Sequence, residues 1–430
     1  MLKIESCKVG SNRTHWWAAA VCLLVVCFGS AFAAPCMAQS KIYVESNDPS
    51  GNAILAYRSD ASGNLTMIGS YATGGNGLYT LQFGPYDNDA PVLLNSAQTL
   101  LFAVNGGSNS VSVFHVNGDG SLLAVSGSPF PSGGIFPVGL ALNGHTLIVV
   151  NKSSQEPTTP VPFAGAPQAL PNYSTFTVSN TGALSANPVS TQDVAYDSSP
   201  SQALVAPRDL LDIFGGALVF GDDFVGGILH SFWISDSGNI TTLQSVGLPA
   251  SEYPAGAPHW PLGMAVDSFH HLLYVGFPTA SKLGVFSYSP LGQLTFLDSV
   301  ANSGKALCWL ALDPMGPYLY STNNIDASVS TYSLADPSSP SETQHLIMTL
   351  PATSSPFQLQ VDARGKFLYI VGQSVTTVAA PPADAGATSG GNVIHVFSID
   401  RMTGMLTEVP SSPTALPVPD ATRAQGMVVF

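Results

Sequence analysis

The chain has 430 residues, of which 45% are hydrophobic, only 9% are charged and 41 are glycine, and its formal net charge is −14. An acidic surface repels phosphate backbones and anionic lipid, so the composition argues against nucleic acid and membrane surfaces as partners. Because charged residues are scarce, Ser, Thr, Asn and Gly must solvate most of the surface, which is typical of strand-rich exported proteins.

The first predicted element is a leader over residues 1–38. Lys3, Lys8 and Arg13 precede an apolar run over residues 16–32, and Ala-x-Ala-like sites end at Ala33 or Ala38. This pattern predicts a secretory signal peptide, and hence a secreted or periplasmic protein. An uncleaved membrane anchor is the alternative, but the apolar run is short for a span. Cleavage would leave 10 basic and 26 acidic residues, a net charge of −16.

The cysteines divide between the leader and the rest of the chain. The leader holds four of them: Cys7, Cys22, Cys27 and Cys36. Only Cys308 follows, so an intramolecular disulfide and a thiolate zinc site are both excluded from the mature chain. Cys308 stands beside Trp309 in an expected innermost strand, where a buried, inert thiol is predicted.

A pattern of four short strands separated by turns recurs after the leader, at intervals of roughly 45–65 residues. One copy has its strands at residues 261–266, 272–276, 284–288 and 292–296. Seven copies can be laid out; they contain residues 41–44, 100–105, 137–142, 217–220, 272–276, 318–321 and 356–362. Strands such as Val111-Ser112-Val113-Phe114 alternate apolar and small polar residues, as half-buried strands do. We therefore predict an all-β fold, a seven-bladed β-propeller over residues 39–430. A pair of β-sandwiches is the structural alternative.

The first copy lacks its first strand, and the chain ends with a strand that could replace it. Residues 425–430, Gln-Gly-Met-Val-Val-Phe, align with Leu262-Gly263-Met264-Ala265-Val266 of the fifth copy. A propeller ring closes when the end of the chain supplies a strand to the blade begun at its start, which leaves no inner edge unpaired. The sequence thus predicts that Val428 lies beside Tyr43.

The longest insertions are expected on one rim of the ring, the rim where first strands begin and second strands end. They span residues 76–90, 155–172 and 376–391, and the latter two are rich in Pro, Ala and Gly. Long loops on one rim of a rigid scaffold commonly build or cover a binding site. Tolerated surface insertion is the simpler alternative.

Several polar and aromatic side chains are predicted at this rim, which we call the mouth. The repeat places there His259, Trp260, Lys305, Trp309, Phe357, Gln358, Arg423 and Gln425, with Asp222 and Asp223 after a second strand. Two adjacent carboxylates could bind a cation or hold a sugar hydroxyl, although neighbouring strand residues point to opposite sides. A solvated turn is the alternative. His259-Trp260 could supply a base and a stacking surface, or an aromatic wedge between blades.

No short motif assigns a reaction or a cofactor. The sequence contains no HExxH, no GxSxG, no phosphate-binding glycine loop before a helix and no EF-hand spacing. We therefore expect neither a metal nor a cofactor.

Residues 100–114, Cys308-Trp309-Leu310-Ala311-Leu312-Asp313-Pro314 and residues 365–371 resemble the lactonase family of seven-bladed propellers, which includes bacterial 6-phosphogluconolactonases and carboxymuconate-cyclising enzymes. The resemblance covers about residues 41–430. It implies a Pro-Arg-His at the start of an innermost strand and a Glu after a following second strand. No corresponding position here carries Arg-His, and Phe224, preceded by Asp223, stands in the Glu position. The family's catalytic residues therefore cannot be transferred one by one.

The resemblance implies a metal-independent opening of a sugar or other small lactone. Among the residues predicted at the mouth, Asp223 or His259 would act as base and Arg423 as carbonyl or carboxylate clamp. A phosphosugar is disfavoured, because such substrates are intracellular and the mouth offers only Lys305 and Arg423. The alternative is a non-catalytic propeller that binds a glycan, a peptide or a cell-surface partner through Trp260, Trp309 and Gln358. Asp222 is a further substrate-binding candidate. A structural spacer is a third hypothesis, and we expect a monomer.

Overall fold

The computed structural model describes residues 39–77, 91–152, 169–196, 198–207, 215–348, 354–374, 391–419 and 422–430. Gln39–Phe430 form one unit, which is described here by itself. The predicted signal peptide lies outside the described residues. So does almost all of the three predicted insertions, of which only residues 76–77, 169–172 and 391 are described.

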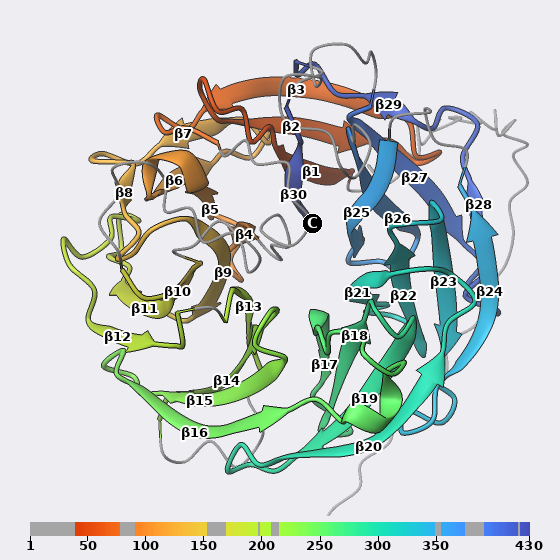
Figure 1. The fold of residues 1–430 in the computed structure, drawn as a ribbon. Helices are drawn as coiled ribbons and strands as arrows, with labels where there is room; N and C mark the ends of the chain where they lie inside the picture. The colour runs from red at the N-terminus through yellow and green to blue at the C-terminus, as the bar shows by residue number, and fades with distance from the viewer. Residues whose placement is uncertain are drawn as a thin grey trace, which may run out of the picture. The chain divides into compact units, whose positions relative to one another are not determined.

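Seven antiparallel sheets form a ring in the described part of the chain (Figure 1). Each sheet is one blade, with its first strand at the centre and its fourth at the outside. Blade 1 contains β30 (Gln425–Val429), β1 (Ser40–Glu45), β2 (Ala53–Ser59) and β3 (Leu65–Ala72). Blade 2 contains β4 (Val92–Leu94), β5 (Leu100–Asn105), β6 (Ser110–Val116), β7 (Leu122–Ala124) and β8 (Phe130–Pro131). Blade 3 contains β9 (Pro137–Asn143), β10 (Thr146–Asn151), β11 (Asn172–Thr177) and β12 (Ser190–Asp193).

The other four blades follow in chain order. Blade 4 contains β13 (Pro200–Val205), β14 (Ala217–Asp223), β15 (Ile228–Ile234) and β16 (Ile240–Gly247), and blade 5 contains β17 (Leu262–Asp267), β18 (Leu272–Phe277), β19 (Lys282–Tyr288) and β20 (Leu294–Ala301). Blade 6 contains β21 (Leu307–Leu312), β22 (Tyr318–Asn323), β23 (Ser328–Ser333) and β24 (Ser341–Ile347). Blade 7 contains β25 (Ser354–Val361), β26 (Phe367–Ser374), β27 (Val393–Ile399), β28 (Leu406–Glu408) and β29 (Thr414–Ala415). Two short 3-10 turns, η1 (Gly106–Ser108) and η2 (Ala250–Glu252), complete the described elements.

The carboxyl-terminal strand closes the ring as predicted. β30 pairs with β1 in antiparallel register, and Val428 stands opposite Tyr43. Lys41 and Phe430 exchange two backbone hydrogen bonds of 2.8 and 3.1 Å, and the Phe430 ring stacks on Tyr43. The prediction of an all-β, seven-bladed propeller is therefore confirmed, and the sandwich alternative is excluded.

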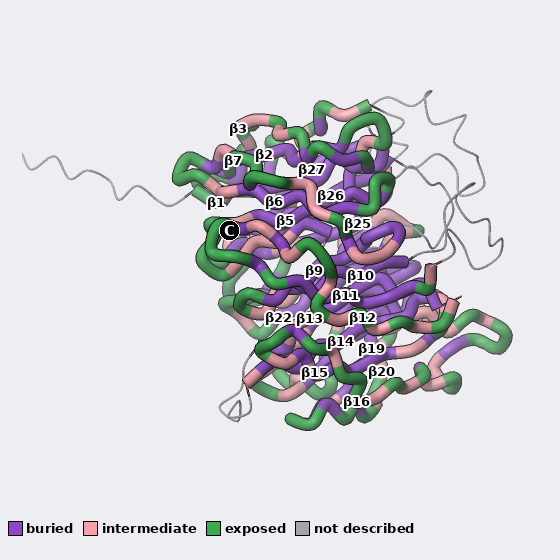
Figure 2. Tube along the Cα trace, turned by 90° about the vertical axis from the view of Figure 1, so that its left-hand side faces the viewer, coloured by how far each residue is buried: buried purple, intermediate pink, exposed green. Residues whose placement is uncertain are grey.

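The core lies between the blades, because the middle strands bury both faces (Figure 2). β14, β18, β22 and β26 are buried along their whole length, whereas the outer strands β16 and β24 alternate between exposed and partly exposed residues. This difference explains why second strands read as continuous apolar runs and outer strands as alternating ones. Cys308 is buried, as predicted.

Glutamine side chains connect neighbouring blades. Gln202 Oε1 in blade 4 accepts a 2.7 Å hydrogen bond from the Met264 amide in blade 5, and Gln358 Oε1 in blade 7 accepts one of 2.6 Å from the Gly426 amide in β30. Gln244 and Gln344 bind the outer strands of the next blades in the same way. Each amide satisfies backbone groups that the blade's own ladder leaves unpaired.

Candidate functional site

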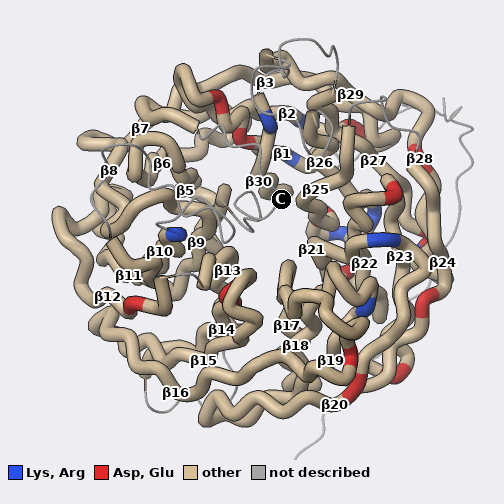
Figure 3. Tube along the Cα trace, viewed as in Figure 1, with Lys and Arg blue, Asp and Glu red and all other residues tan. Residues whose placement is uncertain are grey.

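Charged groups are sparse in the ring, and Figure 3 shows the acidic ones mainly along outer strands and loops. At the mouth, second strands end in polar residues that are buried rather than free. Asn105 donates to Ser110 and Ser112, and Asn323 donates to Ser328 and Ser330. These side chains join second strands to third strands, so the polar strand ends are mostly structural.

Asp222, at the end of β14, is fully buried and holds the start of β13. Its carboxylate accepts hydrogen bonds from the Gln202 amide (2.7 Å), the Ser201 hydroxyl (2.7 Å) and the Ser201 amide (3.3 Å). Burial raises the pKa of Asp222 to about 6, although these hydrogen bonds and the charge of Lys152 oppose that shift. The three donors stabilise the β13–β14 pairing where its register shifts, between Pro200 and Gln202 of β13. Asp222 therefore has a structural role in this arrangement.

Asp223 is 1% exposed and is bound on one side only. Its Oδ2 lies 2.9 Å from Nε2 of His230 on β15, and Nδ1 of His230 lies 2.7 Å from the Ser245 hydroxyl on β16. Within the described residues, Asp223 Oδ1 has no hydrogen-bond partner. A buried carboxylate oxygen without a partner is costly, and such atoms occur at functional sites.

Tyr173 of blade 3 closes the cluster from the neighbouring blade. Its hydroxyl donates to the Asp222 carbonyl at 3.0 Å. Burial, and then the charges of Asp223 and Asp222, raise the pKa of Tyr173 well above its ordinary value. Gly221 leaves room for this contact, because a Cβ at that position would lie 2.6 Å from the tyrosine oxygen. Tyr173 thus stays a neutral donor beside the two carboxyl groups.

Phe224, which follows the two aspartates in the chain, links three blades at the mouth. Its ring packs on Trp260 of blade 5 at a centroid distance of 4.8 Å, and Lys152 Nζ of blade 3 lies 5.9 Å from its centroid. Lys152 is fully buried, and its charge reaches Asp222. The structure therefore gathers a lysine, two aspartates and two aromatic rings at one place.

His259 and Trp260 are half-buried beside this cluster. The His259 ring packs on Tyr253 at 4.7 Å, and Tyr253 donates to the Trp260 carbonyl. Gly227 lies so close that a Cβ there would be 2.5 Å from the His259 carbonyl oxygen. The structure thus brings Asp222, Asp223, His259 and Trp260 to one corner, formed by blades 4 and 5.

Three other predicted site residues add no functional group to this corner, although Trp309 shares a hydrophobic cluster with Phe224 and Trp260. Arg423 precedes β30, where its carbonyl accepts from Asn47 of blade 1, and Figure 1 shows β30 and β14 on opposite sides of the ring. Trp309 is 1% exposed and packs on Phe357 at 4.4 Å. Gln358 is the buried link to Gly426. The structure does not bring Arg423 to Asp223, and it gives Trp309 and Gln358 packing and bridging contacts.

Sequence reasoning did not select His230, Lys152 or Ser198, all of which belong to this corner. The Ser198 hydroxyl is buried without a partner in the described part of the chain. A Cβ on Gly226 would lie 3.3 Å from Asp223 Cβ and 3.4 Å from Ser198 Cβ. A signal was present: His230-Ser231-Phe232 recurs as His395-Val396-Phe397 in the third strand of blade 7. Lys152 had no such signal, because only the fold brings it to blade 4.

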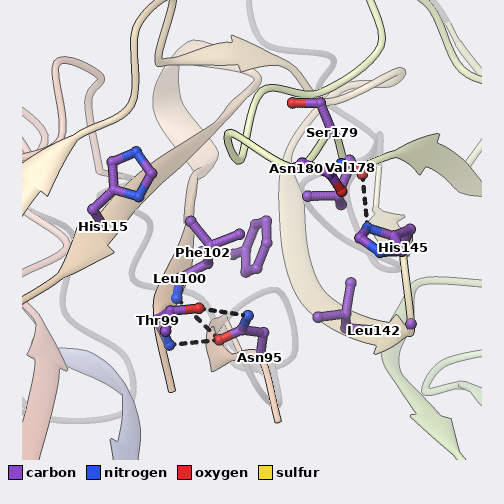
Figure 4. Close-up of a pocket in the computed structure, with 11 residues that line it drawn as sticks. Asn95, Thr99, Leu100, Phe102, His115, Leu142, His145, Val178, Ser179 and Asn180 are labelled. Atoms are coloured by element: carbon purple, nitrogen blue, oxygen red, sulfur yellow. Dashed lines mark hydrogen bonds between the residues drawn. The ribbon is translucent and has the colours of Figure 1, made fainter. Parts of the chain in front are cut away.

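A cavity of about 330 Å³ opens on the opposite rim, between blades 2 and 3 (Figure 4). His115 and His145 lie on opposite sides of it. Polar groups that line the cavity bind nearby backbone: Asn95 Oδ1 accepts hydrogen bonds from the Thr99 and Leu100 amides. His145 Nδ1 lies 3.1 Å from the Val178 carbonyl oxygen. No predicted site residue lines this cavity.

Within the described ranges, no group of three or more His, Cys, Asp or Glu side chains is arranged to hold a metal ion. The same ranges contain no helix that is long and apolar enough to cross a bilayer.

The comparisons with known proteins agree with the fold. Residues 236–371 match the family described as "Lactonase, 7-bladed beta-propeller", which confirms the resemblance seen in the sequence. No curated protein matches the chain. Among solved structures, a putative 6-phosphogluconolactonase from Bacteroides fragilis NCTC 9343 is similar with a TM-score of 0.63, at 16% identity over 91% of this chain and 98% of that one.

Two further structures are similar over nearly their whole length. A putative 6-phosphogluconolactonase from Bacteroides uniformis ATCC 8492 has a TM-score of 0.64, at 15% identity over 91% of this chain and 99% of that one. The periplasmic gluconolactonase PpgL of Pseudomonas aeruginosa has a TM-score of 0.63, at 15% identity over 90% and 99%. At these identities the likeness shows the fold alone.

Proposed function

From the premise that this chain is a seven-bladed propeller resembling the lactonase family, we propose that it opens the ring of a small sugar-derived or other non-phosphorylated lactone. The reaction takes place at the corner of the mouth formed by blades 3, 4 and 5. Asp223 is the general base, and Lys152 replaces Arg423 as the cation of the site.

The observation that carries this proposal is the half-bound carboxylate of Asp223. His230 fixes one oxygen at 2.9 Å, while the other oxygen is buried without a partner among the described residues. A general base needs a fixed position and a free lone pair at the reacting atom. Asp223 has both, and the fully buried Asp222, which is held by three donors, has no comparable free oxygen.

The chemistry follows from these positions. Asp223 Oδ1 takes a proton from water as the water oxygen bonds to the lactone carbonyl carbon. The Lys152 ammonium stabilises the negative charge that develops on the carbonyl oxygen. The ring carbon–oxygen bond then breaks, and the leaving oxygen takes the proton back from Asp223. The product is a hydroxy acid, and no co-reactant other than water is needed.

Access to Asp223 requires a local movement, because Asp223 and the neighbouring Phe224 are each only 1% exposed. Phe224 packs on Trp260, which is half-buried, so Trp260 can meet a substrate before Phe224 moves. A flat indole face beside polar groups suits the stacking of a sugar ring. His259, packed on Tyr253, is then a second proton carrier at the edge of the site rather than the base.

The test is hydrolysis of a panel of small lactones. We expect Asp223→Asn to lower kcat by about 10²–10⁴-fold, the usual contribution of a general base. Asp119→Asn, at an exposed turn, is the matched control and should retain full activity. Activity that is unchanged in Asp223→Asn, or no hydrolysis of any lactone by the parent protein, would contradict the proposal.

The binding alternative rests on Trp260, because Trp309 and Gln358 are both buried. In that case a glycan array should show a ligand whose binding is lost in Trp260→Ala, while the parent hydrolyses no lactone. Trp233→Ala, which changes a half-buried tryptophan on β15, is the control.

We also propose export of the mature chain, supported by the leader pattern of residues 1–38 and by the periplasmic location stated for PpgL. Amino-terminal sequencing of the protein recovered from the periplasm or medium should begin after Ala33 or Ala38. Size-exclusion chromatography of this material would test the predicted monomer. A leader retained on the protein in the membrane fraction would contradict export.

A further inference from the structure

Blade 7 contains a second buried imidazole, and its hydrogen-bond partners differ from those of His230. His395 on β27 is 0% exposed, and its Nδ1 lies 2.6 Å from Glu408 Oε1 on β28. The Ser412 hydroxyl donates to the same carboxylate oxygen at 2.7 Å. Burial alone would raise the pKa of Glu408, but the hydrogen bonds from His395 and Ser412 outweigh it and lower that pKa. Glu408 is therefore an ionised acceptor that fixes the ring.

This contact decides which ring nitrogen is basic. An ionised carboxylate only accepts hydrogen bonds, so Nδ1 of His395 carries the hydrogen. In the neutral imidazole the lone pair is then on Nε2. Nε2 is buried, and among the described residues it has no partner.

A serine hydroxyl lies beside the same glycine as this ring, although no hydrogen bond joins the hydroxyl to Nε2. The Ser354 hydroxyl oxygen is also buried and has no partner in the described part of the chain. A Cβ on Gly372 would lie 2.7 Å from Ser354 Oγ and 3.6 Å from His395 Cδ2, the ring carbon bonded to Nε2. Both side chains therefore flank the same glycine, and a side chain at that position would collide with Ser354.

Blade 4 shows that this arrangement is not a general consequence of the repeat. Asp223 and Gly372 occupy equivalent positions, because they pair with Pro200 and Pro356 respectively. In blade 4 the carboxylate of Asp223 binds Nε2 of His230 and blocks it. In blade 7 the carboxylate is on the fourth strand and binds the other ring nitrogen, so the buried Nε2 has no partner among the described residues.

We propose that Ser354, His395 and Glu408 form a second reactive centre that accepts the acyl group of a small uncharged ester or lactone. Ser354 is the nucleophile, His395 the general base, and Glu408 a positioning residue that acts through His395. The Ser354 oxygen bonds to the carbonyl carbon while its proton passes to His395 Nε2. The ester carbon–oxygen bond breaks, and the leaving oxygen takes that proton. Water then releases the acid by the same steps, with His395 again as base.

This reaction does not involve Asp223, so acyl transfer at Ser354 and lactone opening at Asp223 can each be disproved without the other. The test is labelling of the full mature chain with a fluorophosphonate probe, followed by peptide mapping, with p-nitrophenyl acetate hydrolysis as a second readout. In the labelling step a serine oxygen–phosphorus bond forms, the phosphorus–fluorine bond breaks and the proton passes to His395. We expect the label on Ser354, and a loss of labelling of at least about 100-fold in Ser354→Ala and His395→Gln.

Ser198 is the matched control, because it occupies the same position in blade 4 beside a blocked imidazole. Ser198→Ala and Asp223→Asn should both retain the label on Ser354. Glu408→Gln should slow labelling and Glu408→Asp should restore part of the rate, which a merely structural role would not produce. Thermal melts establish that each variant folds. Absence of label from Ser354 in a folded parent, equal labelling of Ser198, or labelling indifferent to His395→Gln would overturn the proposal.

Discussion

Blades 4 and 7 begin with the same residues and end with different chemistry. Both open on Ser-Ser-Pro-x-Gln, at residues 198–202 and 354–358, and both carry His-x-Phe in the third strand. In both blades the imidazole stacks near the following phenylalanine. The second strand differs: blade 4 has Asp222 and Asp223 where blade 7 has Val371 and Gly372.

This comparison indicates that the position of one carboxylate determines whether the buried histidine or the carboxylate itself can act as a base. In blade 4 the carboxylate binds Nε2, and its second oxygen has no partner in the described part of the chain, so the aspartate is the available base. In blade 7 the carboxylate approaches Nδ1, so the imidazole is the available base. The second and third strands pair in the same register in both blades, so the difference in chemistry comes from side chains rather than from the ring.

The largest expected effect comes from removing β30, the closing strand that Gln358 of blade 7 contacts. Deletion of residues 425–430 removes three buried side chains, Met427, Val428 and Val429, worth together about 5–9 kcal/mol at about 1.5–3 kcal/mol each. This approaches the whole stability of a typical domain, so we expect an unfolded or aggregated protein. Circular dichroism melts check it, with deletion of Phe430 alone as the milder control. An unchanged melting temperature would show that ring closure contributes little.

A smaller effect tests the extra charge of blade 4. The pKa of Asp222 is raised from 3.8 to about 6 by burial, so between those values the folded chain keeps a proton that the unfolded chain releases. The free energy of unfolding therefore falls as the pH rises from about 4 to 6, by roughly 3 kcal/mol from this group. Asp222→Asn should remove that fall, so the loss of stability between pH 4 and pH 7 should be smaller in the variant than in the parent.

Urea denaturation of parent and variant at pH 4 and pH 7 measures this difference. Val371, the equivalent residue of blade 7, carries no charge, and Val371→Ala should lower stability equally at both pH values. A pH dependence that is the same in Asp222→Asn and the parent would mean that Asp222 is not the group responsible.

The smallest effect tests the bridges that the two blades share. Gln202→Ala and Gln358→Ala each leave a buried amide without its acceptor, at Met264 and Gly426 respectively, and should cost about 1–3 kcal/mol. The exposed Gln293→Ala should change stability by less than about 0.5 kcal/mol. Denaturant midpoints measure all three. A cost confined to one blade would show that the bridges are not equivalent.

Much of the fold could be predicted because strand patterns and turns are local. Residues 261–296 display four strands in order, and the alignment of residues 425–430 with residues 262–266 placed Val428 beside Tyr43. The corner of the mouth was predicted in part: Asp222, Asp223, His259 and Trp260 lie together. The prediction failed for Arg423 and Trp309. The repeat predicts the rim on which a residue lies, but it predicts neither the distance between residues of different blades nor their burial.

The amino-acid pattern by itself determined the number of blades, the displaced closing strand and the rim that collects polar side chains, since each follows from periodicity along the chain. Only the tertiary structure decided which polar atoms remain without partners. Hydrogen bonds such as His230–Asp223 and His395–Glu408 join residues of different strands. Their geometry depends on register and on small residues such as Gly221 and Gly372, and no local pattern contains that information.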